Sequence, residues 1–421
     1  MNLIFYLIVS IIVLEYFFGL ILDVLNSKAR KKPLNHRLIG VFSSGQYKKS
    51  QLYESAKDRL DLISGVLMFI LTLIVILSGF LGNVDSIIRS YTEHYILLPL
   101  LFLGIIGILI DIISLPFQCI HTFIIEERFG FNKSNWKIFV TDKLKSLLLS
   151  VVIGGGLLTL IIIVFHFTGA WFWVITLGIL SVFMLFFTFF YSSLIVPLFN
   201  KQTPLPEGEL RSAIEDFANK TGFALENIFV IDGSKRSSKA NAYFAGLGRR
   251  KRIVLYDTLI QNHTTKEIVA ILAHEVGHNT LKHVRNGLIL GILQMGLMLF
   301  ILGLFIAPES EISENISRAI AGESAKASFH LGILAFGILY TPVSVILGIL
   351  FSYISRRNEY AADAFAAEKY EVTALQSALI SLSNNNLSNL QPHPAYVFVH
   401  YSHPPLLQRL IALDKLKENN E

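Results

Sequence analysis

Two histidines and a glutamate with metal-binding spacing lie in the segment IVAILAHEVGHNTLKHVRN. The motif HEVGH occupies residues 274–278, and H-E-x-x-H arises by chance in only about 2% of chains of this composition. On a helix, His274 and His278 lie one turn apart on the same face, so both imidazoles can reach one Zn²⁺. Glu275 then faces the open position of the metal and can accept a proton from its water. The alternative is a pair of solvated helix histidines, which the apolar residues before the motif disfavour.

A third ligand must come from another part of the chain. His283 follows His278 by five residues, about 140° around a helix, so we expect it to point away and to pack at an interface or beside a ligand. The stretch NEYAAD offers Glu359 as the ligand and Asp363, one turn later, as a carboxylate that can hydrogen-bond a ligand histidine. Without further information, a surface glutamate paired with Arg356 explains Glu359 equally well.

The composition indicates a membrane protein. The 421 residues are 53% hydrophobic and only 16% charged, with a mean hydropathy of +0.55, which is too apolar for a soluble chain of this size. A helix needs roughly 20 apolar residues to cross a hydrocarbon core. Seven runs are long enough: 3–25, 62–82, 95–119, 146–167, 171–196, 287–306 and 329–352. The first run has no basic residues in front of it and no cleavage pattern, so we expect a retained span rather than a signal peptide.

The placement of basic residues predicts the orientation. Loops 26–59 and 120–145 are rich in Lys and Arg, whereas the loops on the opposite side carry few. By the positive-inside rule, the N-terminus lies outside, and the polar segments 197–286 and 353–421 face the cytoplasm of a bacterial inner membrane or an endoplasmic-reticulum-type membrane.

The sequence divides into four regions. Residues 1–196 form a membrane region with spans one to five, 197–286 a catalytic segment, 287–352 spans six and seven with the outer loop 307–328, and 353–421 a second catalytic segment with the third ligand. The fold class is therefore mainly α, polytopic in the membrane, with a cytosolic domain that contains a small sheet and the candidate zinc site.

Local patterns place the site on helices. We expect a helix over about 207–221 and a hairpin within 237–257. Thr264 and Glu267 form a capping-box signature. Since no proline follows before Pro308, the HEVGH helix is expected to continue into span six, and the helix of span seven is likewise expected to extend past Glu359.

Nucleic acid is not an expected partner. The basic run 249–252 is explained as a solvated loop or an anionic-lipid contact beside so many apolar runs. Cys119 is the only cysteine, which excludes a thiolate metal cluster.

Six motifs together resemble the type I CAAX prenyl protease family of membrane zinc endopeptidases. They are PFQCIHTFIIEERFGFNKS, PLFNKQTPLPEGELR, NAYFAG, HEVGH, RRNEYAADAFA and YSHPPLLQRL, and they run from about residue 110 to 415.

The resemblance implies a role for each matching residue. His274, His278 and Glu359 are the zinc ligands, and Glu275 is the catalytic base. The roles of the other residues concern orientation and substrate: Asp363 supports a ligand, His403 stabilises the oxyanion with Arg409 beside it, and Asn241 holds substrate backbone. From the sequence alone, His403 could equally be a turn residue before two prolines, and Asn241 the end of a strand.

The implied reaction is removal of the last three residues from prenylated proteins ending C-a-a-X, with one Zn²⁺ per chain. The expected partners are a prenylated or hydrophobic peptide and membrane lipid. Polar residues within spans agree with a hydrated chamber among the helices: Glu15, Asp23, Asp111 and His166. One alternative is a general quality-control membrane protease, which five spans before the motif disfavour. Another is a transporter or scaffold with a structural zinc, for which Glu275 has no use.

Overall fold

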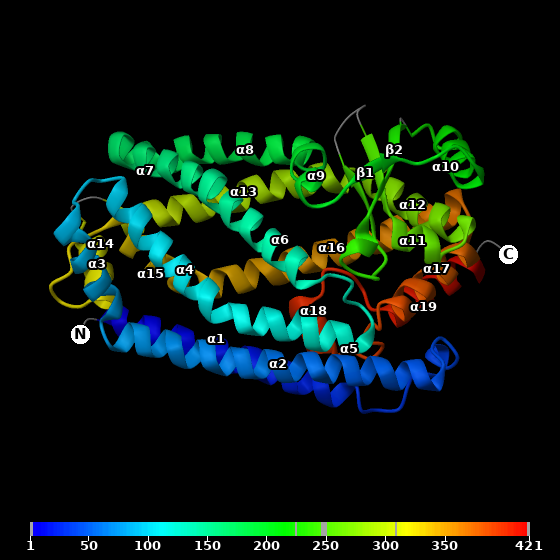
Figure 1. Ribbon diagram of the computed structural model, residues 1–421, viewed down its shortest axis with the longest axis horizontal. Helices are drawn as coiled ribbons and strands as arrows, with labels where there is room; N and C mark the ends of the chain where they lie inside the picture. Colours follow the sequence, from blue (N-terminus) through cyan, green and yellow to red (C-terminus); the bar gives the residue numbers. More distant parts are fainter. Residues whose placement is uncertain (1–2, 224, 246–250, 308–309, 419–421) are drawn as a thin grey trace.

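The protein is elongated, with long helices at one end and a small sheet surrounded by shorter helices at the other (Figure 1). The computed structural model describes residues 3–223, 225–245, 251–307 and 310–418. The long helices run side by side along the long axis (Figure 1). The apolar and polar parts of the sequence are therefore separated in space.

Within the described residues, five helical segments are long and apolar enough to cross a membrane. They are α1 (Leu3–Ala29), α2 (Ser44–Leu77), Leu97–Phe129, Trp136–Phe199 and α13 (His283–Ile306). The count becomes six if α15 (Phe329–Leu339) and α16 (Thr341–Lys369), which are bent by 53° relative to each other, form one span. The prediction of a polytopic membrane protein is confirmed, with five or six candidate spans in the described residues.

The segment Trp136–Phe199 holds two of the predicted spans. Its 64 residues would extend roughly 96 Å as one straight helix, about three times the hydrocarbon thickness. Instead α7 (Gly156–Thr168) ends at Gly169, whose φ of +51° suits glycine. The following helix α8 (Phe172–Leu194) then runs back beside α7 (Figure 1).

The sheet has four strands in the order β1-β2-β4-β3. The strands are β1 (Gln202–Pro204), β2 (Leu225–Ile231), β3 (Ala242–Ala245) and β4 (Lys251–Tyr256). β2 and β4 are parallel, while β1 and β3 pair antiparallel to them at the two edges. The predicted hairpin is confirmed by β3 and β4, although residues 246–250 of its turn, with Arg249 and Arg250, lie outside the described residues.

Short helices accompany this sheet. α10 (Glu209–Lys220) and α11 (Asp257–Asn262) contact it, and the others pack mainly on helices: α12 (Thr265–Thr280), α17 (Val372–Asn385), α18 (Pro394–His400) and α19 (Leu406–Glu418). At the other end of the molecule lie α3 (Phe80–Tyr91) and α14 (Glu311–Ala321). The helix predicted over 207–221 is confirmed as α10.

One hydrophobic core joins the two polar segments of the sequence. Ile253, Leu255 and Leu272 of the first segment are buried in the same cluster as Leu375 and Leu413 of the second. The chain leaves this core through α13 and returns to it along α16. Burial of these side chains is the main force that holds the two segments together.

The helix with the HEVGH motif is shorter than predicted. Thr264 and Glu267 form the expected capping box, but α12 ends at Thr280. Lys282 adopts a left-handed conformation with φ of +62°, and α13 begins at His283. The prediction of one continuous helix into span six is wrong, because a left-handed residue breaks a helix without proline. The predicted extension of span seven past Glu359 is correct, because α16 continues past residue 352 to Lys369.

α12 packs closely against α16 at Gly277. A Cβ atom built on Gly277 would lie 3.2 Å from the Cα and the carbonyl oxygen of Ala362 and 3.2 Å from Cβ of Phe365. Two of these three atoms belong to the backbone of a helix and cannot easily move. The glycine of HEVGH therefore allows the close approach of the two helices.

We predict that Gly277→Ala destabilises the protein, although Gly→Ala in a helix normally stabilises by about 0.5–1 kcal/mol. Overpacking against Ala362 should cost about 1–3 kcal/mol, visible as a lower thermal unfolding midpoint in detergent. Gly291→Ala in α13 is the control, since no heavy atom lies within 4 Å of its added Cβ. An equal or higher midpoint for Gly277→Ala than for Gly291→Ala would contradict the packing argument.

Candidate metal centre

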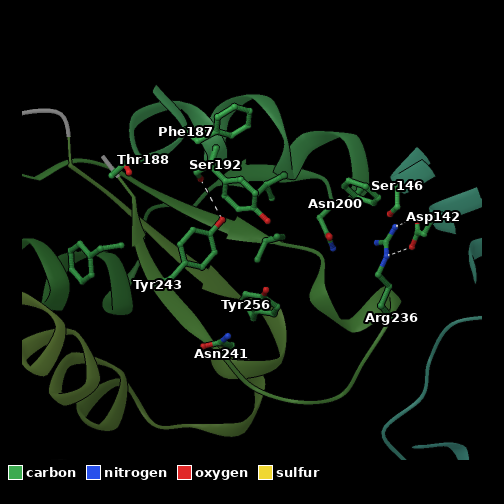
Figure 2. Close-up of a pocket in the computed structure, with 15 residues that line it drawn as sticks. Asp142, Ser146, Phe187, Thr188, Ser192, Asn200, Arg236, Asn241, Tyr243 and Tyr256 are labelled. Carbon is green, nitrogen blue, oxygen red and sulfur yellow. Dashed lines mark hydrogen bonds and ion pairs between the residues drawn. The ribbon is translucent and has the colours of Figure 1, made fainter. Parts of the chain in front are cut away.

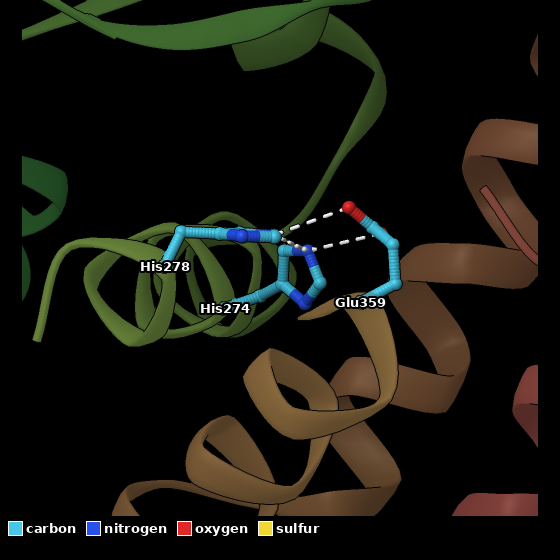
Figure 3. Close-up of side chains that lie close together, drawn as sticks. All are labelled: His274, His278 and Glu359. Atoms are coloured by element: carbon cyan, nitrogen blue, oxygen red, sulfur yellow. Dashed lines mark hydrogen bonds and ion pairs between the residues drawn. The ribbon is translucent and has the colours of Figure 1, made fainter. Parts of the chain in front are cut away.

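Three side chains from two helices meet at one point. His274 and His278 project from α12, and Glu359 projects from α16 toward both rings (Figure 3). Their ligand atoms all lie within 4.8 Å of one another. The structure thus brings together the three residues that the sequence analysis named as ligands.

The spacing of the three groups fits a tetrahedral metal. The two Nε2 atoms lie 3.1 Å apart. Glu359 lies 3.2 Å from His278 Nε2 through its Oε1 and 3.4 Å from His274 Nε2 through its Oε2. Bonds of about 2.0–2.1 Å in a tetrahedron place neighbouring ligand atoms about 3.3 Å apart. The donor set, two imidazoles and a carboxylate, leaves the fourth position open, as in catalytic zinc sites.

A buried carboxylate orients His274. Asp363 Oδ1 lies 2.8 Å from His274 Nδ1, and Asp363 is only 1% exposed. This contact leaves Nε2 free to face Glu359. Burial by itself would lower the pKa of His274, but the hydrogen bonds to Asp363 and Glu359 raise it to about 9. The surroundings of the ring therefore favour a positive charge.

Arg409 of α19 balances these carboxylates. Its guanidinium donates two hydrogen bonds to Asp363, at 2.8 and 2.6 Å, and lies 3.7 Å from Glu359. Burial would lower the pKa of Arg409, but Asp363, Glu359 and Glu275 together raise it. The structure pairs Arg409 with Asp363, and it brings Arg409 and His403 to the same oxygen, Oε2 of Glu359.

The two other predicted catalytic residues border the site. Glu275 follows His274 on α12 and is partly exposed. His403 lies between α18 and α19, with Nδ1 2.9 Å from Glu359 Oε2 and 66% of its side chain exposed. His403 thus lies at the rim of the cluster, where a substrate can approach it.

His283 lies beside a candidate ligand histidine, which is one of the two placements that we expected for it. Its Nδ1 lies 3.1 Å from Nδ1 of His278. The expectation that His283 points away is wrong, because the left-handed turn at Lys282 returns the chain over α12. As a result, both candidate ligand rings have a partner on the nitrogen that faces away from Glu359. No sequence signal for this turn was available, since lysine rarely adopts a left-handed conformation.

Asn241 lies at the edge of the sheet, directly before β3. Its side-chain oxygen accepts a hydrogen bond from the backbone N–H of Ala242 at 2.8 Å. Together with Tyr243 and Tyr256 it lines a cavity of about 870 Å³ that reaches α8 (Figure 2). The structure therefore places Asn241 beside a hollow between the sheet and the membrane helices, and not in the metal cluster.

Comparison with known proteins identifies the family. Residues 23–201 match the family described as CAAX prenyl protease N-terminal, five membrane helices, and residues 204–417 match peptidase family M48. The chain belongs to peptidase family M48. M48 membership makes it a membrane metalloendopeptidase, as the sequence analysis predicted.

Individual M48 relatives are similar over most of their length. The chain is 34% identical to CAAX prenyl protease 1 homolog of Oryza sativa subsp. japonica, over 98% of both chains. It is 39% identical to CAAX prenyl protease 1 of Saccharomyces cerevisiae, over 79% of this chain and 76% of the relative. The crystal structure of S. mikatae Ste24p superimposes with a TM-score of 0.90 at 34% identity, over 98% of this chain and 99% of that one. The fold of this M48 peptidase is thus the fold of Ste24p.

We predict that Arg409→Met strongly destabilises the metal-free protein. The substitution leaves the buried carboxylates of Asp363 and Glu359 without their cation, and breaking a buried pair in this way costs about 3–5 kcal/mol. Thermal unfolding with chelator present measures the effect.

Arg318→Met is the matched control. Arg318 pairs with Glu314 at 3.1 Å, and both side chains are more than 40% exposed, so the loss should stay below about 1 kcal/mol. Equal unfolding midpoints of the two variants would show that Arg409 does not balance the site.

Proposed function

We propose that this protein is a zinc-dependent endopeptidase that removes the last three residues from prenylated proteins ending C-a-a-X. The observation that carries the proposal is the convergence of His274, His278 and Glu359, with Glu275 beside the first histidine, in a body of apolar helices. The names of the relatives, CAAX prenyl protease 1, support the substrate class.

In this proposal, one Zn²⁺ is held by His274, His278 and Glu359. When bound, the ion supplies Lewis acidity, which polarises the scissile carbonyl and acidifies water. Glu275 accepts the proton of the attacking water and passes it to the leaving amine. His403, exposed at the rim, donates a hydrogen bond to the developing oxyanion.

The surrounding residues keep the ligands in place. Asp363 fixes the ring of His274, Arg409 fixes Asp363, and His283 fixes the ring of His278. Asn241 lies where an extended substrate can add to the sheet, because β3 is an edge strand and pairs with β4.

We infer the following membrane arrangement. The chain has seven spans, because the reversal at Gly169 separates α7 from α8 and the bent pair α15 and α16 counts as one. Residues 1–196 and 287–352 form the membrane region, and 197–286 and 353–421 form the catalytic domain. The N-terminus lies outside and the catalytic domain on the cytoplasmic side, as the basic loops indicate.

A hydrated chamber among the spans would receive the lipid-modified tail. Glu15, Asp23 and Asp61 line a cavity of about 450 Å³ beside α1 and α2, and carboxylates at such positions require water or a partner. The proposed partners are therefore a prenylated or hydrophobic peptide and the membrane lipid around it. The names of the relatives, CAAX prenyl protease 1, disfavour a general quality-control protease.

We predict that Glu275→Gln abolishes cleavage of a farnesylated C-a-a-X peptide by the purified protein in detergent. The amide cannot accept the proton, but it does not touch the proposed ligands, so bound zinc should stay near one per chain. Release of the three-residue product and metal analysis measure the two quantities. Undiminished cleavage by the variant would overturn the mechanism, and equal cleavage of unprenylated peptides would favour quality control.

We predict that His283→Ala weakens zinc binding by about 10–100-fold, the usual effect of removing a group that orients a ligand. Competition with a chromophoric chelator measures the affinity without any assay of activity. Lys282→Ala, next to it in the turn, is the control, because the Lys282 side chain forms no hydrogen bond or ion pair with the described residues. An unchanged affinity in His283→Ala would show that the ring of His278 is held by other groups.

A further inference from the structure

The segment 233–239, which leads into β3, is attached to the loop after the third apolar helix. The backbone N–H of Lys133 donates to the carbonyl of Arg236 at 3.0 Å, and the N–H of Ser238 donates to the carbonyl of Phe131 at 3.0 Å. Asn132 and Ser237 form an antiparallel bridge between these two bonds. The motif EERFGFNKS thus forms a short ladder with the chain just before Asn241.

A charged cluster strengthens this attachment. Lys239 Nζ donates hydrogen bonds to Glu126 Oε2 and to the hydroxyl of Tyr53, each at 2.9 Å. The Tyr53 hydroxyl also donates to the other oxygen of Glu126. Tyr53 and Glu126 are almost fully buried, and the ammonium lies 4.6 Å from the ring centre of Phe131. Lys239 is therefore held by α2 and by the helix that ends in this loop.

The helix bearing Glu126 has an unusual form. Residues His121–Glu126 form a π-helical turn, η2, within the apolar segment Leu97–Phe129. Single π-helical turns inside α-helices occur frequently at functional sites, because they redirect side chains. Here the turn ends at the residue that binds Lys239.

A second link holds the same segment from another side. Arg236 donates two hydrogen bonds to Asp142 of α6 (Trp136–Leu149), at 2.7 and 2.9 Å (Figure 2). The carbonyl of Lys239 accepts a hydrogen bond from the Thr258 hydroxyl at 2.9 Å. The chain is thus fixed at residues 236 and 239, shortly before it enters the outer strand.

We propose that Lys239, bound by Glu126 and Tyr53, is a positioning residue for the substrate-binding edge of the sheet. This inference rests on the proposed function, in which Asn241 and β3 receive the peptide backbone. The outer edge of β3 must stay open for the substrate, so the sheet supports this strand from the β4 side alone. On the β4 side, the N–H of Tyr256 donates to the carbonyl of Asn241 at 3.1 Å. Lys239, two residues before Asn241, adds a fixed point from outside the sheet.

Loss of the Lys239 contacts should weaken substrate binding more than it slows the chemical step. The proposed metal ligands lie on α12 and α16. Neither helix contributes to the Lys239 clamp, by which we mean Lys239 with Glu126 and Tyr53. Loss of the clamp leaves Glu275 and the ligands in place but lets the peptide-binding strand move. Binding of substrate in the reactive geometry depends on sub-ångström placement, so looser positioning weakens binding.

The test is the kinetics of Lys239→Met with a farnesylated C-a-a-X peptide. We expect KM to rise about tenfold while kcat stays within about twofold and zinc content is unchanged. The pair Glu126→Gln with Lys239→Met removes both charges, avoids a lone buried carboxylate, and should show the same rise in KM. Lys239→Arg keeps the cation and should retain most of the affinity. Lys235→Met, an exposed lysine in the same segment, is the control for loss of charge and should leave KM unchanged.

A double-mutant cycle with Asn241→Ala decides whether Lys239 acts through the substrate-binding edge. If it does, adding Lys239→Met to Asn241→Ala raises KM much less than Lys239→Met alone. Independent, multiplying effects would overturn the inference, as would a fall in kcat and in the unfolding midpoint without a change in KM. Failure of the unmodified protein to cleave prenylated peptide would instead overturn the proposed function, and with it this inference.

Discussion

The close contact between α12 and α16 is the constraint on which the rest of the structure depends. His274 and His278 lie on one helix, and Glu359 lies on another, 81 residues later than His278 in the chain. A glycine at 277 lets the backbones of the two helices approach. The core formed by the two polar segments surrounds this contact and buries it. The ligand geometry is therefore a consequence of helix packing, in which a change of a single methyl group is felt.

Around this contact, each buried carboxylate has a basic side chain as its partner. The carboxylates of Glu359 and Asp363 are buried, and burial of a charge is tolerated when it is paired and hydrogen-bonded. Arg409 pairs with Asp363, Asp363 with His274, and His283 with His278. Each side chain of the site is thus held by a second one, which in turn belongs to a different helix or to the turn at Lys282.

The parts of the site that could be predicted are those with a regular spacing. The i, i+4 histidines and the capping box follow from helix geometry, and the lengths of the apolar runs follow from bilayer thickness. The NEYAAD stretch makes Glu359 a candidate ligand, but only the family resemblance decides between a ligand and a surface glutamate, because spacing cannot pair two distant helices. The turn at Lys282 could not be predicted, since the left-handed conformation of a lysine is imposed by tertiary packing, and this turn decides that His283 lies beside His278 and not at another interface. Strand β1, three residues long and ending at Pro204, was likewise too short to give a pattern.

The break at Lys282 also has a mechanical consequence. Apolar helices adjust their tilt to the thickness of the surrounding bilayer. A change of tilt in α13 is not transmitted along a continuous helix to α12, because the helix is interrupted at residues 281–282. By contrast, α16 is one continuous helix from Thr341 to Lys369, so a change of tilt at its start displaces the part that carries Glu359. The two imidazoles are therefore coupled to α13 mainly through the contact of His283 with His278, while the carboxylate opposite them lies on a helix that continues without a break toward the membrane.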